Sequence, residues 1–150
     1  MKYLWLIPFA VAIGIGSVAP AQSPSPRENL HITVQKICPI SGETLGQRGQ
    51  PVKVRIDEET VYLCCKACLK NEVNPRHWIT IHANIAKAQR ICPVMKHELP
   101  DNPKWTIVEG QIIFVCCPPC IPKIEADPAT YRRQVDQLYE KSLKDRDPSR

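Results

Sequence analysis

Hydrophobic and polar residues alternate along four short runs, which are arranged as two pairs. Residues Pro51–Ile56 and Thr60–Cys64 flank a short acidic turn in the first pair. Residues Lys104–Val108 and Gln111–Cys116 flank Glu109-Gly110 in the second, a dipeptide typical of a tight hairpin turn. Because alternation with a period of two indicates half-buried strands, each pair predicts a β-hairpin.

A helix is predicted after each hairpin. Asn74 and Asp127 are favourable N-caps, and each precedes a proline that suits the first helical position. Apolar residues then recur at helical spacing, which predicts a helix from Pro75 to about Arg90 and another after Pro128. The stripes expected to face the core are Trp78, His82, Ile85 and Ala86, and Tyr131, Val135, Leu138 and Tyr139.

The order of elements recurs because the sequence itself repeats. "ICPISGETL" (Ile37–Leu45) returns as "ICPVMKHEL" (Ile91–Leu99), and "VYLCCKACL" (Val61–Leu69) returns as "IIFVCCPPCI" (Ile112–Ile121). The repeat predicts an α+β fold of two small tandem modules. Each module has a Cys-Pro turn, a β-hairpin and a short helix that carries cysteines. A helical linker joins the modules, and a C-terminal helix follows the second.

The first residues have the pattern of a secretory signal. Lys2 precedes an apolar run from about Leu4 to Val18, and Ala19-Pro20-Ala21 fits the small-x-small cleavage rule. A retained membrane anchor is the alternative, but the run is short for a span and is broken by proline and glycine. The predicted organisation is a signal peptide (residues 1–21), a flexible spacer (22–36), module 1 with the linker helix (37–90), module 2 with the C-terminal helix (91–143) and a disordered tail (144–150).

Composition narrows the function classes. The net charge of +5 is mild, and basic residues lack the stripe that nucleic-acid binding requires. The carboxylates Asp57, Glu58 and Glu59 are interpreted as a solvated turn, so nothing indicates hydrolytic chemistry. Fifteen prolines and few aromatic residues predict a small apolar core, which cross-links or metal ions would help to stabilise.

The eight cysteines divide equally between the modules. Cys68 follows Cys64 by four positions and Cys65 by three, so these thiols can share one helix face, and the Cys-Pro turn can bring Cys38 opposite them. A helix N-terminus is expected to lower their thiol pKa. Three or four sulfurs suit Zn(II), and three suit Cu(I). The candidate metal ligands are Cys38, Cys64, Cys65 and Cys68, and Cys92, Cys116, Cys117 and Cys120.

Further ligands are less well indicated. Met95 offers a thioether that favours Cu(I), although an isolated methionine is more often packing. His77, His82 and His97 have no equivalent positions in the two modules, so each is interpreted as a surface or core residue.

This arrangement resembles the TRASH/YHS-type modules, which are linked to trafficking, resistance and sensing of heavy metals. Their pattern of one Cys, a spacer of about twenty residues and C-x-x-x-C matches Cys38, Cys64 and Cys68, and also Cys92, Cys116 and Cys120. The spacers here are 25 and 23 residues, and Cys65 and Cys117 are additional to the pattern. Pro122 is expected to make the second cysteine helix short or irregular.

Within metal binding, a purely structural zinc ion that supports partner binding is the close alternative, and two alternatives to metal binding also remain open. An exported small chain with an even number of cysteines also fits a disulfide framework, although the vicinal pairs make complete bridging awkward. Cys65-x-x-Cys68 and Cys117-x-x-Cys120 resemble thiol oxidoreductase motifs, but the βαβ context is missing. The hypothesis is an exported, non-enzymatic protein, periplasmic or secreted, that binds up to one Zn or Cu(I) per module. Another exported or membrane protein is its candidate partner, with no nucleic acid and no membrane span after cleavage.

Overall fold

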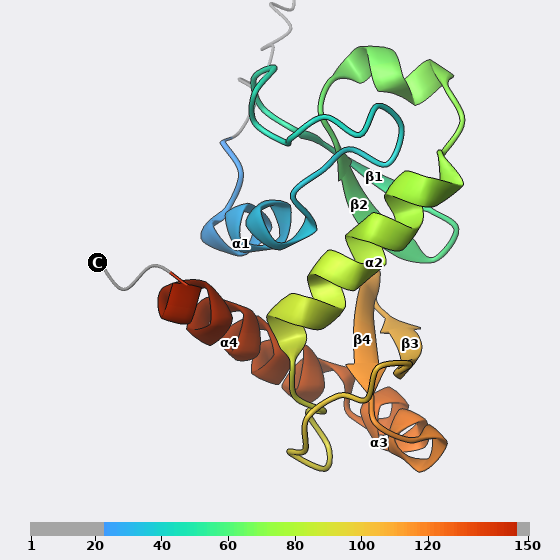
Figure 1. Ribbon diagram of the computed structural model, residues 1–150, viewed down its shortest axis with the longest axis vertical. Helices are drawn as coiled ribbons and strands as arrows, with labels where there is room; N and C mark the ends of the chain where they lie inside the picture. The colour runs from blue at the N-terminus through green and yellow to red at the C-terminus, as the bar shows by residue number, and fades with distance from the viewer. Residues whose placement is uncertain (1–22, 147–150) are drawn as a thin grey trace, which may run out of the picture.

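The computed structural model describes residues 23–146 (Figure 1), so the predicted signal peptide lies outside the described residues. The fold is α+β, as predicted, with two antiparallel two-stranded hairpins and four α-helices in the described region. The elements are α1 (Pro26–Gln35), β1 (Val52–Ile56), β2 (Glu59–Leu63), the 3-10 helix η1 (Lys66–Lys70), α2 (Pro75–Gln89), β3 (Lys104–Val108), β4 (Gln111–Val115), the 3-10 helix η2 (Pro118–Cys120), α3 (Ile121–Ala126) and α4 (Pro128–Arg146).

The hairpins form where the alternation of the sequence predicted them. In the second, Glu109 and Gly110 both have positive φ, as a two-residue primed turn requires. The first hairpin has a shorter turn than predicted, because Glu59 already pairs with Ile56. Glu59 is therefore a strand residue that is only 3% exposed, and its carboxylate is 2.9 Å from His82 Nε2. The prediction that Glu59 is solvated is wrong, because strand alternation directs it inward.

The predicted flexible spacer, residues 22–36, contains a helix instead. Ser25 begins α1 with a capping box, in which its side chain accepts from the Glu28 backbone N–H and Glu28 accepts from the Ser25 N–H. Pro26 occupies the first turn of α1, where a backbone N–H would have no partner within the helix, so proline costs no hydrogen bond there. Val34 near the end of α1 is 2% exposed. The proline and serine that suggested a spacer are thus the start signals of a packed helix.

The predicted tail also begins later than expected. Residues 144–146 belong to α4, and residues 147–150 lie outside the described part of the chain. Arg146 explains the extra turn, because its Nη2 donates to the Lys87 carbonyl at 3.3 Å and to Ser142 Oγ at 3.1 Å. The last turn of α4 is therefore attached to the end of α2.

Helices α1, α2 and α4 contact one another, and α2 runs between the two hairpins (Figure 1). The hairpins also meet, since the Thr60 N–H donates to the Gly110 carbonyl at 2.7 Å. The larger core cluster joins all three of these helices to the second hairpin and α3. Its buried members are Val34, Ile81, Ile85, Ala88, Cys92, Val108, Ile112, Ile113, Phe114, Val115, Cys120, Ile124, Val135 and Tyr139.

A smaller core lies under the first hairpin. Its buried members are Cys38, Leu63, Cys64 and Cys68, so three of four carry a thiol. The few apolar residues around it, such as Val52 and Val54, are only partly buried. This smaller core is therefore made largely of cysteine.

A buried glutamine stands before each Cys-Pro turn, at the end of the preceding helix, so the repeat extends backwards by one helix. Gln35 Nε2 donates to the Tyr62 carbonyl at 2.7 Å, and Gln35 Oε1 accepts from the Tyr62 N–H at 2.9 Å. Gln89 makes the same pair of bonds to Phe114, at 2.6 and 2.9 Å. Helix α1 therefore holds β2 as α2 holds β4, and the sequence signal is "VQKICP" repeated as "AQRICP".

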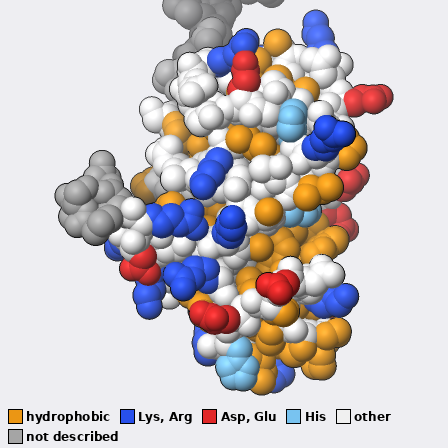
Figure 2. Space-filling model, viewed as in Figure 1, with side chains coloured by type: hydrophobic (Ala, Val, Ile, Leu, Met, Phe, Trp, Pro, Cys, Tyr) orange, Lys and Arg blue, Asp and Glu red, His pale blue; other side chains and the backbone are white. Residues whose placement is uncertain are grey.

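The surface combines charged and apolar areas. Figure 2 shows apolar side chains gathered over the second hairpin and α3. Ile79 and Trp105 are 68% and 51% exposed. Within residues 23–146, no helix combines the length and the apolar character needed to cross a membrane.

Candidate metal centre

The two Cys-Pro turns position Cys38 and Cys92 with the same backbone bonds. The Cys38 N–H donates to the Glu43 carbonyl at 2.8 Å, and the Cys38 carbonyl accepts from the Gly42 N–H at 2.9 Å. Cys92 makes the equivalent bonds with His97 and Lys96, at 2.8 and 2.9 Å. Both cysteines are 0% exposed. The turn thus presents a thiol to the interior of each module.

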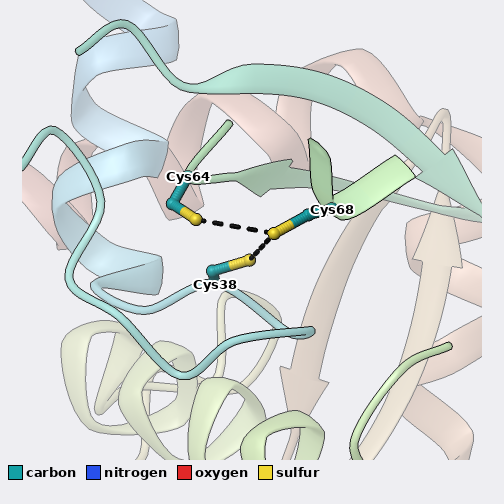
Figure 3. Close-up of side chains that lie close together, drawn as sticks. All are labelled: Cys38, Cys64 and Cys68. Atoms are coloured by element: carbon teal, nitrogen blue, oxygen red, sulfur yellow. Dashed lines mark hydrogen bonds between the residues drawn. The ribbon is translucent and has the colours of Figure 1, made fainter. Parts of the chain in front are cut away.

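In the first module, the turn cysteine meets two cysteines from the end of the hairpin. Cys64 follows β2 and Cys68 lies in η1. Figure 3 shows the three sulfurs pointing toward one another. Cys68 Sγ lies 3.8 Å from Cys38 Sγ and 3.6 Å from Cys64 Sγ. All three ligand atoms lie within 4.8 Å of one another, and all three residues are buried.

The second module repeats this triad with Cys92, Cys116 and Cys120. Their ligand atoms again lie within 4.8 Å of one another, and Cys92 Sγ is 3.8 Å from Cys120 Sγ. Cys116 is only partly buried, so this centre is more open than the first. Pro122 stands in the first turn of α3, which is six residues long, as the sequence predicted for this helix.

The sulfur spacing suits a soft metal ion. Zn–S bonds of about 2.3 Å in tetrahedral geometry separate neighbouring sulfurs by about 3.8 Å. The separations of 3.6 and 3.8 Å in the first triad are close to that value. Three convergent sulfurs in a buried site also suit Cu(I). The two triads can therefore each hold one metal ion, and the sulfur positions do not select which metal.

Cys65 and Cys117 lie beside the triads rather than in them. Cys65 Sγ is 3.8 Å from both Cys64 Sγ and Cys68 Sγ, and it is partly exposed. Cys117 Sγ is 3.7 Å from Cys116 Sγ and 3.2 Å from Cys120 Sγ. Each module thus has one additional thiol in contact with two triad members. All eight cysteines are free thiols in the structure.

The thiol acidities differ from the sequence expectation. Burial opposes ionisation of Cys38, but backbone N–H groups of the turn more than offset it and lower the pKa of Cys38 to about 7. The pKa of Cys92 is lowered in the same way. Burial raises the pKa of Cys68 to about 12 and that of Cys116 to about 11, and it also raises the pKa of Cys64 and Cys120.

A helix N-terminus therefore does not lower the pKa of the triad thiols that follow the strands. The relevant helices are short 3-10 turns, and burial dominates. Cys65, outside the triad, behaves differently, because the Cys68 backbone N–H lowers its pKa. The most acidic thiol of the first triad comes from the Cys-Pro turn, whose N–H groups converge on the sulfur.

None of the histidines joins a triad. His77 Nδ1 is 3.2 Å from the Ile40 carbonyl, where it supports the turn. His82 contacts Glu59, and its ring is 5.3 Å from that of Trp78. His97 is exposed. The interpretation of Met95 as a packed core residue is wrong, because this residue is 45% exposed.

Sequence reasoning missed two oxygen groups beside Cys64. Ser41 Oγ lies 3.3 Å and Glu43 Oε2 3.6 Å from Cys64 Sγ. The second module has Met95 and His97 at the aligned positions, so the surroundings of the two triads differ. The available signal was the polar segment "SGETL" directly after a Cys-Pro turn that folds onto the thiols.

Comparison with known proteins does not indicate a family or a function for this chain. No protein-family model, no curated protein and no solved structure matches this chain. The assignment of metal binding therefore rests on the two sulfur triads themselves.

Proposed function

We propose that this chain is an exported metal-binding protein that holds one Zn(II) or Cu(I) ion in each module through cysteine thiolates. The observation that carries the proposal is the duplicated triad. In each module a turn cysteine and two cysteines from the end of the hairpin, more than 20 positions further on, bring their sulfurs within 4.8 Å of one another. A single cluster of buried thiols is compatible with core packing. Two clusters with the same turn, hairpin and spacing favour a shared chemical purpose.

Export is supported by the signal-like sequence of the first residues, and a role in metal buffering, delivery or resistance by the resemblance to TRASH/YHS-type modules. The protein would act by binding rather than by catalysis. Capture of an ion replaces S–H protons, because thiolates are the ligands. The raised pKa of Cys64 and Cys68 means that binding releases protons at neutral pH, so metal affinity is expected to rise with pH.

Native mass spectrometry of the purified protein, combined with thiol counting, tests the proposal. The reduced protein should take up two ions, and the variants Cys38→Ser and Cys92→Ser should each take up one. Ser41→Ala is a matched control that alters a neighbour of Cys64 and should retain both ions. The proposal would be wrong if protein isolated from its export compartment contained no metal and had lost two hydrogens for every bridge. That result would indicate a disulfide framework instead.

A structural metal ion is the second candidate, and the composition of the smaller core favours it. Three of the four buried residues in that core are cysteines, so a bound ion would connect the turn, β2 and η1. A structural ion should exchange slowly with a chelator, and its removal should unfold the first hairpin. A delivered ion should pass rapidly to the chelator, with hydrogen exchange in β1 and β2 changed little. Hydrogen exchange during chelation therefore separates the two roles.

A further inference from the structure

The additional cysteine of each module has no place in the triad, yet it touches a triad sulfur. We propose that Cys65 and Cys117 are oxidation sites that release the metal, because each forms a disulfide with the triad cysteine three positions later. The oxidant is a low-molecular-weight disulfide or the disulfide of a thiol-exchange protein. This inference rests on the proposed function, since it concerns how the bound ion is given up.

The sulfur contacts, together with the geometry that a disulfide requires, favour one partner for each additional thiol. Cys117 Sγ is 3.2 Å from Cys120 Sγ, closer than the 3.7 Å that separates it from Cys116 Sγ. In the first module, Cys65 Sγ is 3.8 Å from Cys68 Sγ and also 3.8 Å from Cys64 Sγ. A bridge between adjacent residues is strained, which leaves Cys68 as the favoured partner of Cys65.

Exposure assigns the order of events. Cys65 and Cys117 are partly exposed, whereas Cys68 and Cys120 are 7% and 2% exposed. An external disulfide therefore reaches Cys65 before Cys68, and Cys117 before Cys120. Cys116 is also partly exposed, but Cys117 is the residue whose sulfur lies 3.2 Å from Cys120 Sγ. The turn cysteines at the far side of each triad are 0% exposed and are protected from direct attack.

The chemistry balances as two thiol–disulfide exchanges. The sulfur of Cys65 attacks the external disulfide, forming a mixed disulfide and releasing one reduced thiol. The sulfur of Cys68 then attacks Cys65 Sγ, forming the protein disulfide and releasing the second reduced thiol. The two protein sulfurs lose two electrons, and the external disulfide gains them. The Cys65 thiol supplies one proton to the released thiols, and water supplies the other because metal-bound Cys68 is already a thiolate. Cys117 and Cys120 react in the same way.

Loss of the ion follows because Cys68 and Cys120 belong to the triads. A disulfide sulfur is no longer a thiolate, so each module keeps only two metal-binding sulfurs. Two ligands do not enclose a soft ion as three do, and the ion passes to a competing chelator. Reduction restores the triad, which makes the release reversible.

The alternative role for Cys65 and Cys117 is that of a fourth metal ligand. A fourth ligand would be required for binding in the reduced protein, whereas a release thiol is required only when the oxidant arrives. The double variant Cys65→Ser/Cys117→Ser separates these roles. Ala67→Ser is a matched control, because it adds a hydroxyl group to the same exposed segment and leaves every thiol in place.

In the experiment, reduced protein is loaded with Zn(II), and glutathione disulfide is then added in the presence of a chromogenic zinc chelator. Wild type and Ala67→Ser should release both ions, with Cys65–Cys68 and Cys117–Cys120 bridges found by peptide mass mapping. The double variant should load two ions and retain them. Dithiothreitol should restore binding to wild type.

Three results would overturn the release mechanism: loss of loading in the reduced double variant, release from that variant at the wild-type rate, or bridges mapped elsewhere in wild type. Failure of the reduced wild-type protein to load zinc or Cu(I) is a different outcome. It would appear in the first step, before any oxidant is added, and would contradict metal binding itself.

Discussion

Position 42 of the first Cys-Pro turn and position 96 of the second have similar backbone conformations but different residues. Gly42 has φ of +74° and Lys96 has φ of +60°. A lysine is thus accommodated in the left-handed region of the second turn. Glycine is needed in the first turn for another reason, because a Cβ at position 42 would lie 2.6 Å from His77 Nε2. The aligned residue in the second module is Thr130, which is shorter than histidine.

Replacing Gly42 by alanine is therefore expected to lower the free energy of unfolding by about 2 to 4 kcal/mol, as the sum of overpacking and left-handed strain. Gly46→Ala is the control, since Gly46 has φ of +91° with no atom within 4 Å of the added Cβ. It should cost about 1 kcal/mol. Urea unfolding of the reduced, metal-free proteins measures both values.

The variant His77→Ala supplies the second arm of this test. In its background, Gly42→Ala should cost no more than Gly46→Ala, because the ring that meets the new Cβ is gone. Equal costs for Gly42→Ala with and without His77 would show that the ring does not select glycine.

The convergence of the cysteines could be predicted at the residue scale, but the acidity of their thiols could not. Cys64 and Cys68 are only four positions apart, so the short bend that leads from β2 into η1 is enough to bring their sulfurs together. The lowered pKa of Cys38 depends on N–H groups from its own turn and from Cys64, a strand end 26 positions away. Such convergence exists only in the folded chain, and burial of Cys68 likewise reverses the acidity expected from its helix.

At the scale of elements, the buried glutamines account for how each helix holds its strand. Gln35 and Gln89 are 4% and 1% exposed, and each amide satisfies both backbone groups of one strand residue. Leucine has a similar size but cannot form these bonds. It would leave a buried N–H and a buried C=O without a partner.

Gln89→Leu and Gln35→Leu are each expected to lower the free energy of unfolding by about 2 to 4 kcal/mol. Gln134→Leu is the control, because Gln134 accepts from Lys96 Nζ at the surface and should change stability by less than about 0.5 kcal/mol. Thermal unfolding monitored by circular dichroism gives the comparison. Costs for the buried variants that match the control would contradict the role of the amide.

The strands and the two long helices could be predicted because their signals are local and periodic. Alternation identified the hairpins, and Asn74 with Pro75 identified the start of α2. Helix α1 was missed because its prolines and serines were weighed as composition. Its start signal depends on position: serine, proline at the next residue and glutamate at the third form a capping box.

At the scale of the whole molecule, a charged cluster joins α1 to α4. Asp136 accepts from Arg27 Nε at 2.6 Å and from Gln111 Nε2 at 3.1 Å, and it lies 2.8 Å from His31 Nε2. Arg27 and Asp136 are 109 positions apart, so no local pattern predicts this contact. Lys53 of β1 links that strand to α1 by donating to Glu28 at 2.9 Å.

Acid is expected to detach α1. Backbone and side-chain bonds from Ser25, with Lys53, lower the pKa of Glu28 from 4.5 to about 2. Burial opposes ionisation of Asp136, but His31 and Arg27 more than offset it, so its pKa also lies below the usual 3.8. Because both pKa values fall on folding, their stabilisation is present above about pH 4.5 and is lost as the pH falls toward 2.

Hydrogen exchange of α1 between pH 5 and pH 2.5 should therefore increase more than that of α2, after correction for intrinsic exchange. In Asp136→Asn, α1 should exchange faster at pH 5 and respond less to acid. A response of α1 that is unaltered by Asp136→Asn would assign the acid sensitivity to other groups.

Helix α2 belongs to both halves of the molecule. Asn74 begins it directly after the first cysteine cluster, and Gln89 ends it by holding the strand of the second module. Units that share a helix in this way form a linear array, in which each helix is the interface between neighbours. This array is closed, because α4 at one end packs on α1 at the other, where Arg27 Nε donates to Asp136. An added unit would keep the helix-to-strand contact at the junction but would separate α1 from α4. The number of thiol centres is therefore tied to the contact that closes the molecule.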